Sequence, residues 1–228
     1  MAIFREGQGI GFAVPVKRLS EAVSEIFTPE EIKGLWLGSR FKMGSGGVVA
    51  ASIEPGSPAD KGGLRTGDLI LRVNGQAART PVEVNREIIA MGETQDFQLQ
   101  VQRKGEHRTL TLRLVPEKEV FNASLIRQKL GVTVQELSAE AAAELGLNST
   151  EGLLIAGVEK NSPAARSNLA RGYVIRTING VTAESIPVAA KMLYPRRPGE
   201  KVELELVVCN LRGRVLDVYP AKAEVIVR

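Results

Sequence analysis

The sequence predicts a mainly β protein with short helices, built as two copies of one small domain. Two observations predict this: blocks of sequence recur 105 residues apart in a single register, and short apolar runs alternate with turn residues. The recurring blocks are Ser57-Pro58-Ala59 with Ser162-Pro163-Ala164, Asn74-Gly75 with Asn179-Gly180, and residues 97–101 with 202–206. A register held over this length indicates a duplicated domain rather than a solenoid unit.

Composition narrows the class of protein. A chain of 228 residues with 43% hydrophobic residues can form two cores without metals or disulfides. Cys209 is the only cysteine, so an intrachain disulfide is impossible, and its apolar surroundings predict a buried, inert thiol. A net charge of +4 without a basic cluster argues against nucleic-acid binding. No apolar stretch approaches the roughly 18 residues of a membrane span, and the start of the chain lacks the pattern of a signal peptide.

The N-terminal part is expected to form β-structure and then a helix. Residues 1–16 are expected to form strands around glycine turns. Residues 16–27 have a helical apolar spacing, which Thr28-Pro29 should end. The apolar positions are Leu19, Ala22, Val23 and Ile26.

The first copy is expected over residues 30–116. Helices are predicted at residues 59–63 and 82–91, and a hairpin turn at residues 104–107. Residues 116–128 are charged and weakly patterned, so they are the expected linker. The predicted strands are residues 35–41, 48–53, 68–73, 97–103 and 109–115.

The second copy repeats this order with one insertion. Nine positions separate Gly38 from Gly47, but twenty-one separate Gly131 from Gly152. The extra residues contain an alanine-rich stretch, 138–146, that begins with serine and ends with glycine. This is the pattern of a capped helix.

Each copy opens with an apolar residue and a glycine directly before a strand. The first copy has Leu37-Gly38-Ser39 and the second has Leu130-Gly131-Val132. Glycine permits a turn that aims successive N–H groups at one anion, and the following strand edge could accept an extended peptide. The simpler alternative is that the Leu-Gly pair only begins a strand.

Trp36 and four apolar helix residues belong to the same repeats as these glycine steps. Trp36 either lines a pocket or anchors the linker. Val84 and Ile88 share one face of the helix predicted at residues 82–91, and Ala189 and Leu193 stand at the same register in the second copy.

The complete repeat resembles a PDZ domain of the bacterial kind. The stretches that carry the resemblance are residues 54–75 and 161–180, with Ser-Pro-Ala, a central glycine and Asn-Gly. Tyr173 stands where the family usually has aspartate. The resemblance implies two partly open β-barrels or sandwiches with two or three helices each. It places the peptide groove on Leu37, Gly38 and Ser39, and on Leu130, Gly131 and Val132. On the facing helices it points to Val84 and Ile88, and to Ala189 and Leu193, for which a place in the core is the alternative.

The opening string, residues 2–16, resembles the last strands of the trypsin-like protease domain of the HtrA/Deg family. This resemblance implies a protease remnant and linker helix at 1–29, a first PDZ domain at 30–116 and a second at 117–228. It also implies a periplasmic or other extracytoplasmic setting, homo-oligomers of the full-length protein, and contact with a protease domain of the same polypeptide.

Residues 44–47, Gly-Ser-Gly-Gly, raise the question of catalysis by the chain itself. Met43 replaces the first glycine of the protease motif, and Ser45 has only one candidate base, His107, the single histidine. No third group orients that base. We therefore expect no catalytic residue in this chain. Without a Cys/His cluster, we also expect no metal and no cofactor.

The function expected from the resemblance is substrate recognition for an HtrA/Deg-like serine endopeptidase. The PDZ pair would bind C-terminal or extended hydrophobic segments of unfolded proteins by β-augmentation, with the terminal carboxylate on the amides of residues 37–39. A non-enzymatic tandem-PDZ scaffold is the alternative. The PDZ pair of an intramembrane metalloprotease is disfavoured because no hydrophobic span flanks the repeats.

Overall fold

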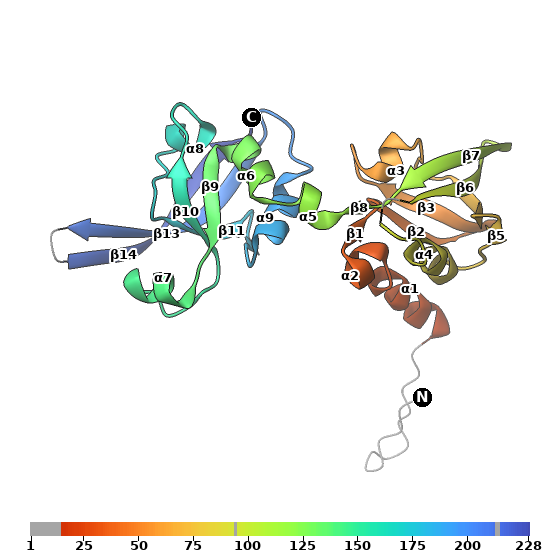
Figure 1. Ribbon diagram of the computed structural model, residues 1–228, viewed down its shortest axis with the longest axis horizontal. Helices are drawn as coiled ribbons and strands as arrows, with labels where there is room; N and C mark the ends of the chain where they lie inside the picture. Colours follow the sequence, from red (N-terminus) through yellow and green to blue (C-terminus); the bar gives the residue numbers. More distant parts are fainter. Residues whose placement is uncertain (1–14, 94, 213–214) are drawn as a thin grey trace, which may run out of the picture. The chain divides into compact units, whose positions relative to one another are not determined.

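The computed structural model describes residues 15–93, 95–212 and 215–228 (Figure 1). These residues divide into two compact units, one ending at Glu117 and the other beginning at Lys118. The strands expected within residues 1–14 lie outside the described part of the chain. Within the described ranges, no helix has both the length and the apolar character needed to cross a membrane.

The first unit is one antiparallel sheet with helices packed around it. Its sheet has the order β2-β3-β4-β6-β7, with β5 on β4, and a separate pair joins β1 to β8. The elements are α1 (Val16–Ile26), α2 (Pro29–Lys33), β1 (Leu35–Trp36), β2 (Ser39–Gly44), β3 (Gly47–Ile53), α3 (Pro58–Lys61), β4 (Leu69–Val73), β5 (Gln76–Ala77), α4 (Pro81–Ile89), β6 (Asp96–Arg103), β7 (Glu106–Arg113) and β8 (Val115–Pro116).

Local sequence explains where these elements begin and turn. Thr28, Ser57 and Thr80 cap the N-termini of α2, α3 and α4, and each is followed by proline at the first helical position. The Thr28-Pro29 pair thus ends α1 as predicted and also starts a second helix. Lys104 and Gly105, at φ +50° and +87°, form a two-residue turn that is tighter than the predicted one.

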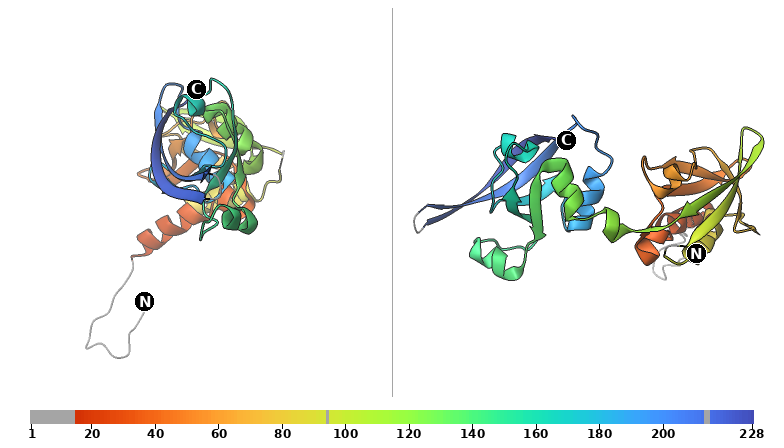
Figure 2. Two further views of the ribbon diagram at one scale, coloured as in Figure 1. Left: turned by 90° about the vertical axis from the view of Figure 1, so that its left-hand side faces the viewer. Right: turned by 45° about the horizontal axis from the view of Figure 1, so that its top comes forward.

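The second unit has the same sheet order, β9-β10-β11-β13-β14, with β12 on β11. The predicted extra helix is confirmed as α7, which Ser138 caps by accepting a hydrogen bond from Ala141 N–H. Strands β13 and β14 form a long ribbon that projects from the unit (Figure 2). The elements are α5 (Glu117–Val120), α6 (Ala123–Leu130), β9 (Val132–Glu136), α7 (Ala139–Glu144), β10 (Leu153–Val158), α8 (Pro163–Arg166), β11 (Val174–Ile178), β12 (Val181–Thr182), α9 (Ile186–Leu193), β13 (Lys201–Arg212) and β14 (Val215–Ile226).

The segment predicted as a weakly patterned linker, 116–128, contains helices α5 and most of α6. Asn122 caps α6, since its side chain accepts hydrogen bonds from the N–H groups of Ser124 and Leu125. Ile126 and Leu130, one helical turn apart, are both buried. A cap and one apolar stripe are enough for a short helix that packs on its own unit.

Each unit buries its own apolar residues. Leu37, Phe41, Val84 and Ile88 belong to the core of the first unit. Cys209, predicted to be buried, is only half-buried on β13. Partial burial raises the pKa of its thiol, against a weaker opposite effect of Arg176.

Candidate peptide-binding site

A glycine turn separates β1 from β2 and divides the single strand predicted over residues 35–41. Gly38 has a φ of +72°, and a Cβ added there would lie 2.3 Å from the Cβ of Ser57. Only glycine fits both this backbone and this space. The Gly38 carbonyl accepts hydrogen bonds from Glu54 N–H at 2.9 Å and from Ser57 Oγ at 3.4 Å. These bonds hold the turn against the start of α3.

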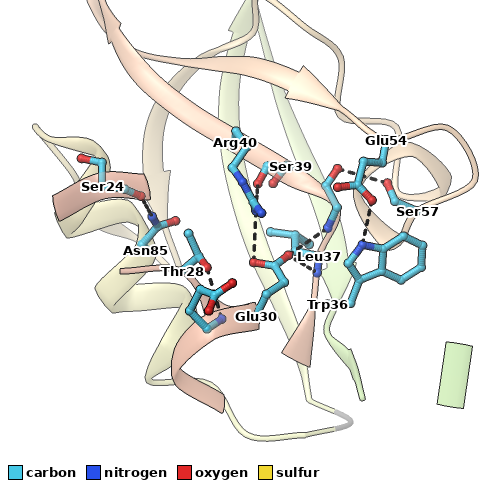
Figure 3. Close-up of polar contacts among 12 residues, drawn as sticks. Ser24, Thr28, Glu30, Trp36, Leu37, Ser39, Arg40, Glu54, Ser57 and Asn85 are labelled. Atoms are coloured by element: carbon cyan, nitrogen blue, oxygen red, sulfur yellow. Dashed lines mark hydrogen bonds and ion pairs between the residues drawn. The ribbon is translucent and has the colours of Figure 1, made fainter. Parts of the chain in front are cut away.

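The amides of this turn converge on one carboxylate. The N–H groups of Leu37 and Gly38 both donate to Oε1 of Glu30, at 3.0 and 3.2 Å (Figure 3). Arg40 Nη1 donates to Oε2 at 3.3 Å, and the Glu30 side chain is only 4% exposed. The turn therefore forms the predicted type of anion nest, but its anion is a side chain of the same domain.

Trp36 and Ser39 flank the nest and have different surroundings. Trp36 is buried, and its Nε1 donates to Glu54 Oε2 at 3.0 Å (Figure 3). Its backbone lies in β1, paired with Val115 of β8. Ser39 is also buried, and its Oγ has no hydrogen-bond partner among the described residues.

A groove of about 430 Å³ lies beside β2, which is an edge strand among the described strands of its sheet. Helix α1, strand β3 and the N-terminus of α4 complete the lining. The lining is partly apolar and carries charges of both signs at its margins. Its residues are Ser24, Glu25, Arg40, Phe41, Lys42, Met43, Ala51 and Pro81. An edge strand next to a lined groove can pair with an extended chain and hold its side chains.

Helix α4 lines the groove with Pro81 and otherwise supports it from the core. Val84 and Ile88 are fully buried in the core with Leu37, so they support the groove rather than line it. Asn85, on the same helix, donates from Nδ2 to the backbone carbonyl of Ser24 at 3.4 Å (Figure 3). This bond joins α4 to α1 and helps place α1 along the groove.

The second copy has the same glycine turn in a different setting. Gly131 has a φ of +78°, and a Cβ there would lie 2.2 Å from the Cβ of Ser162, the counterpart of Ser57. Leu130, however, is the last residue of α6, and Gly131 N–H donates to the Arg127 carbonyl at 2.8 Å. The amide expected in the second nest thus caps a helix.

The remaining site residues predicted in the second copy are core residues. Val132, at the start of β9, is fully buried. Ala189 and Leu193, on α9, are fully buried as well. In each copy the predicted residues lie on one glycine turn and one helix. Among the described residues, the turn of the first copy donates two amide hydrogen bonds to a carboxylate, that of Glu30, whereas the Gly131 amide of the second copy donates to a helix carbonyl.

Ser45 and His107 do not form a pair. Ser45 is an exposed turn residue between β2 and β3, whereas His107 is exposed on β7, the last strand of the sheet order. The hydrogen bond that activates a serine nucleophile requires direct contact with the base.

Sequence reasoning missed Glu30, together with the groove residues that α1 contributes. Thr28-Pro29 followed by Glu30 and Glu31 has the ordinary pattern of a helix start, where acidic residues are stabilised by the helix dipole. The pattern does not reveal that Glu30 turns inward while Glu31 stays exposed. Glu30 is buried because the turn between β1 and β2 lies against α2 and its amides bind the Glu30 carboxylate.

Comparisons with known proteins agree with the repeat. Family models described as PDZ domain match residues 36–114 and 120–207. A probable periplasmic serine endoprotease, DegP-like, from Marinomonas sp. is 27% identical over 87% of this chain and 45% of its own length. A protein of the same name from Chlamydia trachomatis is 28% identical over 86% of this chain and 42% of its own length. The chain thus spans less than half the length of these relatives.

Solved structures with similarity include a serine endoprotease from Yersinia pestis, at 21% identity and a TM-score of 0.33, which covers 49% of this chain and 40% of that one. Another is the PDZ domain of HtrA3 bound to a phage-derived ligand, at 21% identity and a TM-score of 0.31, over 35% of this chain and 84% of that one. On the two family models, the repeated sheet order and the relatives, the chain carries two tandem PDZ domains and is a homologue of DegP-like serine endoproteases.

Proposed function

We propose that the first PDZ domain binds extended apolar segments of unfolded proteins as an added strand on β2. The observation that carries the proposal is the edge position of β2 beside a groove of about 430 Å³. Main-chain pairing would supply affinity for many sequences, and the groove would select side chains. Phe41, Met43 and Pro81 in the lining favour apolar side chains.

We further propose that this recognition serves a serine endopeptidase of the DegP-like kind. In this role the PDZ pair delivers unfolded segments to a protease domain of the same polypeptide, in a homo-oligomer in the periplasm. The names of the relatives, which are periplasmic serine endoproteases, support this role over that of a non-catalytic scaffold. A protease-domain sequence with a complete catalytic triad in the same gene is the genetic observation that tests it.

The binding mode is tested at Met43, on the free edge of β2. Gly44 and Gly47 close a two-residue turn, and ladder bonds alternate along an antiparallel pair, so the N–H of Met43 faces away from β3. Met43→Pro removes this N–H at a position where an edge strand tolerates proline, whereas Met43→Ala removes the same side chain and keeps the N–H.

Fluorescein-labelled β-casein, a protein without stable structure, serves as the probe in an anisotropy titration. We expect Met43→Pro to weaken binding about tenfold more than Met43→Ala, which corresponds to about 1.4 kcal/mol. Equal affinities of the two variants, both still folded by circular dichroism, would show that β2 does not pair with the bound chain.

A further inference from the structure

The nest of the first domain already holds a carboxylate. We propose that Glu30 is a specificity-determining residue, which makes this domain bind internal extended segments in preference to free C-termini. The inference rests on the proposed peptide binding and names the class of segment that is bound. Its basis is that the amides of Leu37 and Gly38, two of the three groups expected to receive a terminal carboxylate, both donate to Glu30 Oε1.

A terminal carboxylate must compete with Glu30 for these amides. Each backbone N–H carries one hydrogen, and the N–H hydrogens of Leu37 and Gly38 already point at Glu30. If Glu30 stays, a second carboxylate would lie beside the first in a poorly hydrated place, which like charges oppose. If Glu30 leaves, a side chain that is only 4% exposed loses both amides and its ion pair with Arg40 at 3.3 Å. Either route weakens the binding of a free C-terminus.

The position of Glu30 is built into the fold. It lies in the first turn of α2, which begins at the Thr28 cap and ends at Gly34, a residue with a φ of +61°. The Gly34 carbonyl accepts a hydrogen bond from Glu117 N–H at 2.9 Å, so the end of α2 is tied to the strand pair β1–β8. Glu30 is therefore held by an anchored helix.

An internal segment does not need the nest. Its backbone can pair with the edge of β2, and its side chains can enter the groove lined by Phe41, Met43 and Pro81. Such a segment brings no terminal charge to Gly38 and can continue past the turn. Binding in this mode leaves Glu30 and its three hydrogen bonds in place.

The competing explanation is that Glu30 only fastens α2 to the turn. A purely structural role predicts that substitutions lower thermal stability and weaken all peptides alike. A role in specificity predicts a change in the ratio of two affinities, for peptides with and without a terminal carboxylate. The ratio is insensitive to a general loss of stability as long as the domain is folded.

The experiment uses the ten-residue β-casein peptide that binds the wild-type chain most tightly in an overlapping peptide array. The peptide is made as the free acid and as the C-terminal amide, and both are titrated by calorimetry. Four proteins are compared: wild type, Glu30→Ala, Glu30→Gln and Glu31→Gln. Glu31 is the matched control because it is the next residue of the same helix and is exposed. If Glu30→Ala does not fold, Glu30→Gln decides, since glutamine keeps the shape and removes the charge.

For the wild type and Glu31→Gln, we expect the amide to bind at least as tightly as the acid. In Glu30→Ala, the acid should gain about tenfold relative to the amide, and Glu30→Gln should change in the same direction by less. A wild-type preference for the acid, or one unchanged ratio in all four proteins, would overturn the role of Glu30 and leave peptide binding intact. Failure of every protein to bind either form would instead overturn the proposed function.

Discussion

At the scale of single residues, the two domains differ most clearly at one buried ion pair. In the first domain Arg103 binds Asp68 through two hydrogen bonds, Nε to Oδ1 at 2.7 Å and Nη2 to Oδ2 at 2.6 Å. Burial by itself would raise the pKa of Asp68, but the bonds from Arg103 and from Arg65 N–H outweigh it and lower the pKa. In the second domain Tyr173 and Val208 stand at the corresponding positions. The second domain thus has neither partner at these positions, so neither charge is buried there without the other.

The ion pair makes the first domain sensitive to acid. A carboxyl whose pKa is lowered by folding binds fewer protons in the folded state than in the unfolded state. Asp68 therefore stabilises the folded domain at pH values above its ordinary pKa of 3.8. That stability is lost as the pH falls through the lowered pKa. Asp68→Asn should reduce the free energy of unfolding by about 3 kcal/mol at pH 7 and flatten the pH dependence below about pH 4.

The fluorescence of Trp36, the only tryptophan and a buried residue of this domain, reports its unfolding in urea. Asp96→Asn is the matched control, because Asp96 pairs with Arg113 where both side chains are more than half exposed. The control should change the free energy of unfolding far less than Asp68→Asn does, because solvent screens an exposed ion pair. Equal decreases in the free energy of unfolding for Asp68→Asn and Asp96→Asn would show that burial does not strengthen the Asp68–Arg103 ion pair.

At the scale of elements, periodicity and turn chemistry in the sequence predicted most of the fold. The helix at residues 16–27, the inserted helix at 138–146 and the order of strands all follow from local patterns. The failures lie where a local signal had two meanings. Helix α6 lies mostly in the segment predicted as a linker. The sequence did not reveal it because its cap and apolar stripe are short and stand among charged residues. The end of that helix, in turn, takes the Gly131 amide away from the predicted nest.

The candidate site could be predicted only in part, for a related reason. The turn at Gly38 could be predicted from the sequence because its positive φ and the close approach of Ser57 both require glycine at this position. The burial of Glu30 is not readable, since it depends on how the sheet brings the turn against α2. Similarly, the spacing of Val84 and Ile88 marks a helix face but does not tell whether a groove or the core lies under it.

The groove beside β2 offers a test at the scale of the element that lines it. Ala51 is a half-buried residue of β3 that lines the groove, at a bulge in the pairing with β2. Ala51→Phe should fill part of the groove and weaken the binding of β-casein about tenfold. Ser52→Phe, at the next position, adds the same ring at an exposed residue outside the lining and should leave affinity unchanged. Anisotropy titrations compare the two, and equal affinities would place the bound chain elsewhere.

At the scale of the whole molecule, duplication preserved the framework and changed the site. Both sheets have the same strand order, and both glycine turns pack against the serine that caps the next helix. The second domain nevertheless has an inserted helix, a turn amide used in helix capping and a longer final ribbon. The turn amide and the inserted helix lie at the two ends of β9, the counterpart of β2, whereas the ribbon lies at the opposite edge of the sheet. The two copies therefore differ around the strand that we propose as the peptide-binding edge of the first domain.

Each copy has its own core, so each should fold alone if it is cut at the right place. The match to the family model ends at residue 114, but β8 follows, and Val115 and Pro116 pair with Trp36 and Leu35. Fragments 15–117 and 118–228 should each unfold cooperatively in urea, as followed by circular dichroism. Fragment 15–114 lacks β8 and the bond from Glu117 N–H to Gly34, so it should be less stable than 15–117 by about 2 kcal/mol. Equal stabilities of these two fragments would show that β8 is dispensable, and a fragment 118–228 without a cooperative transition would show that the second copy does not fold alone.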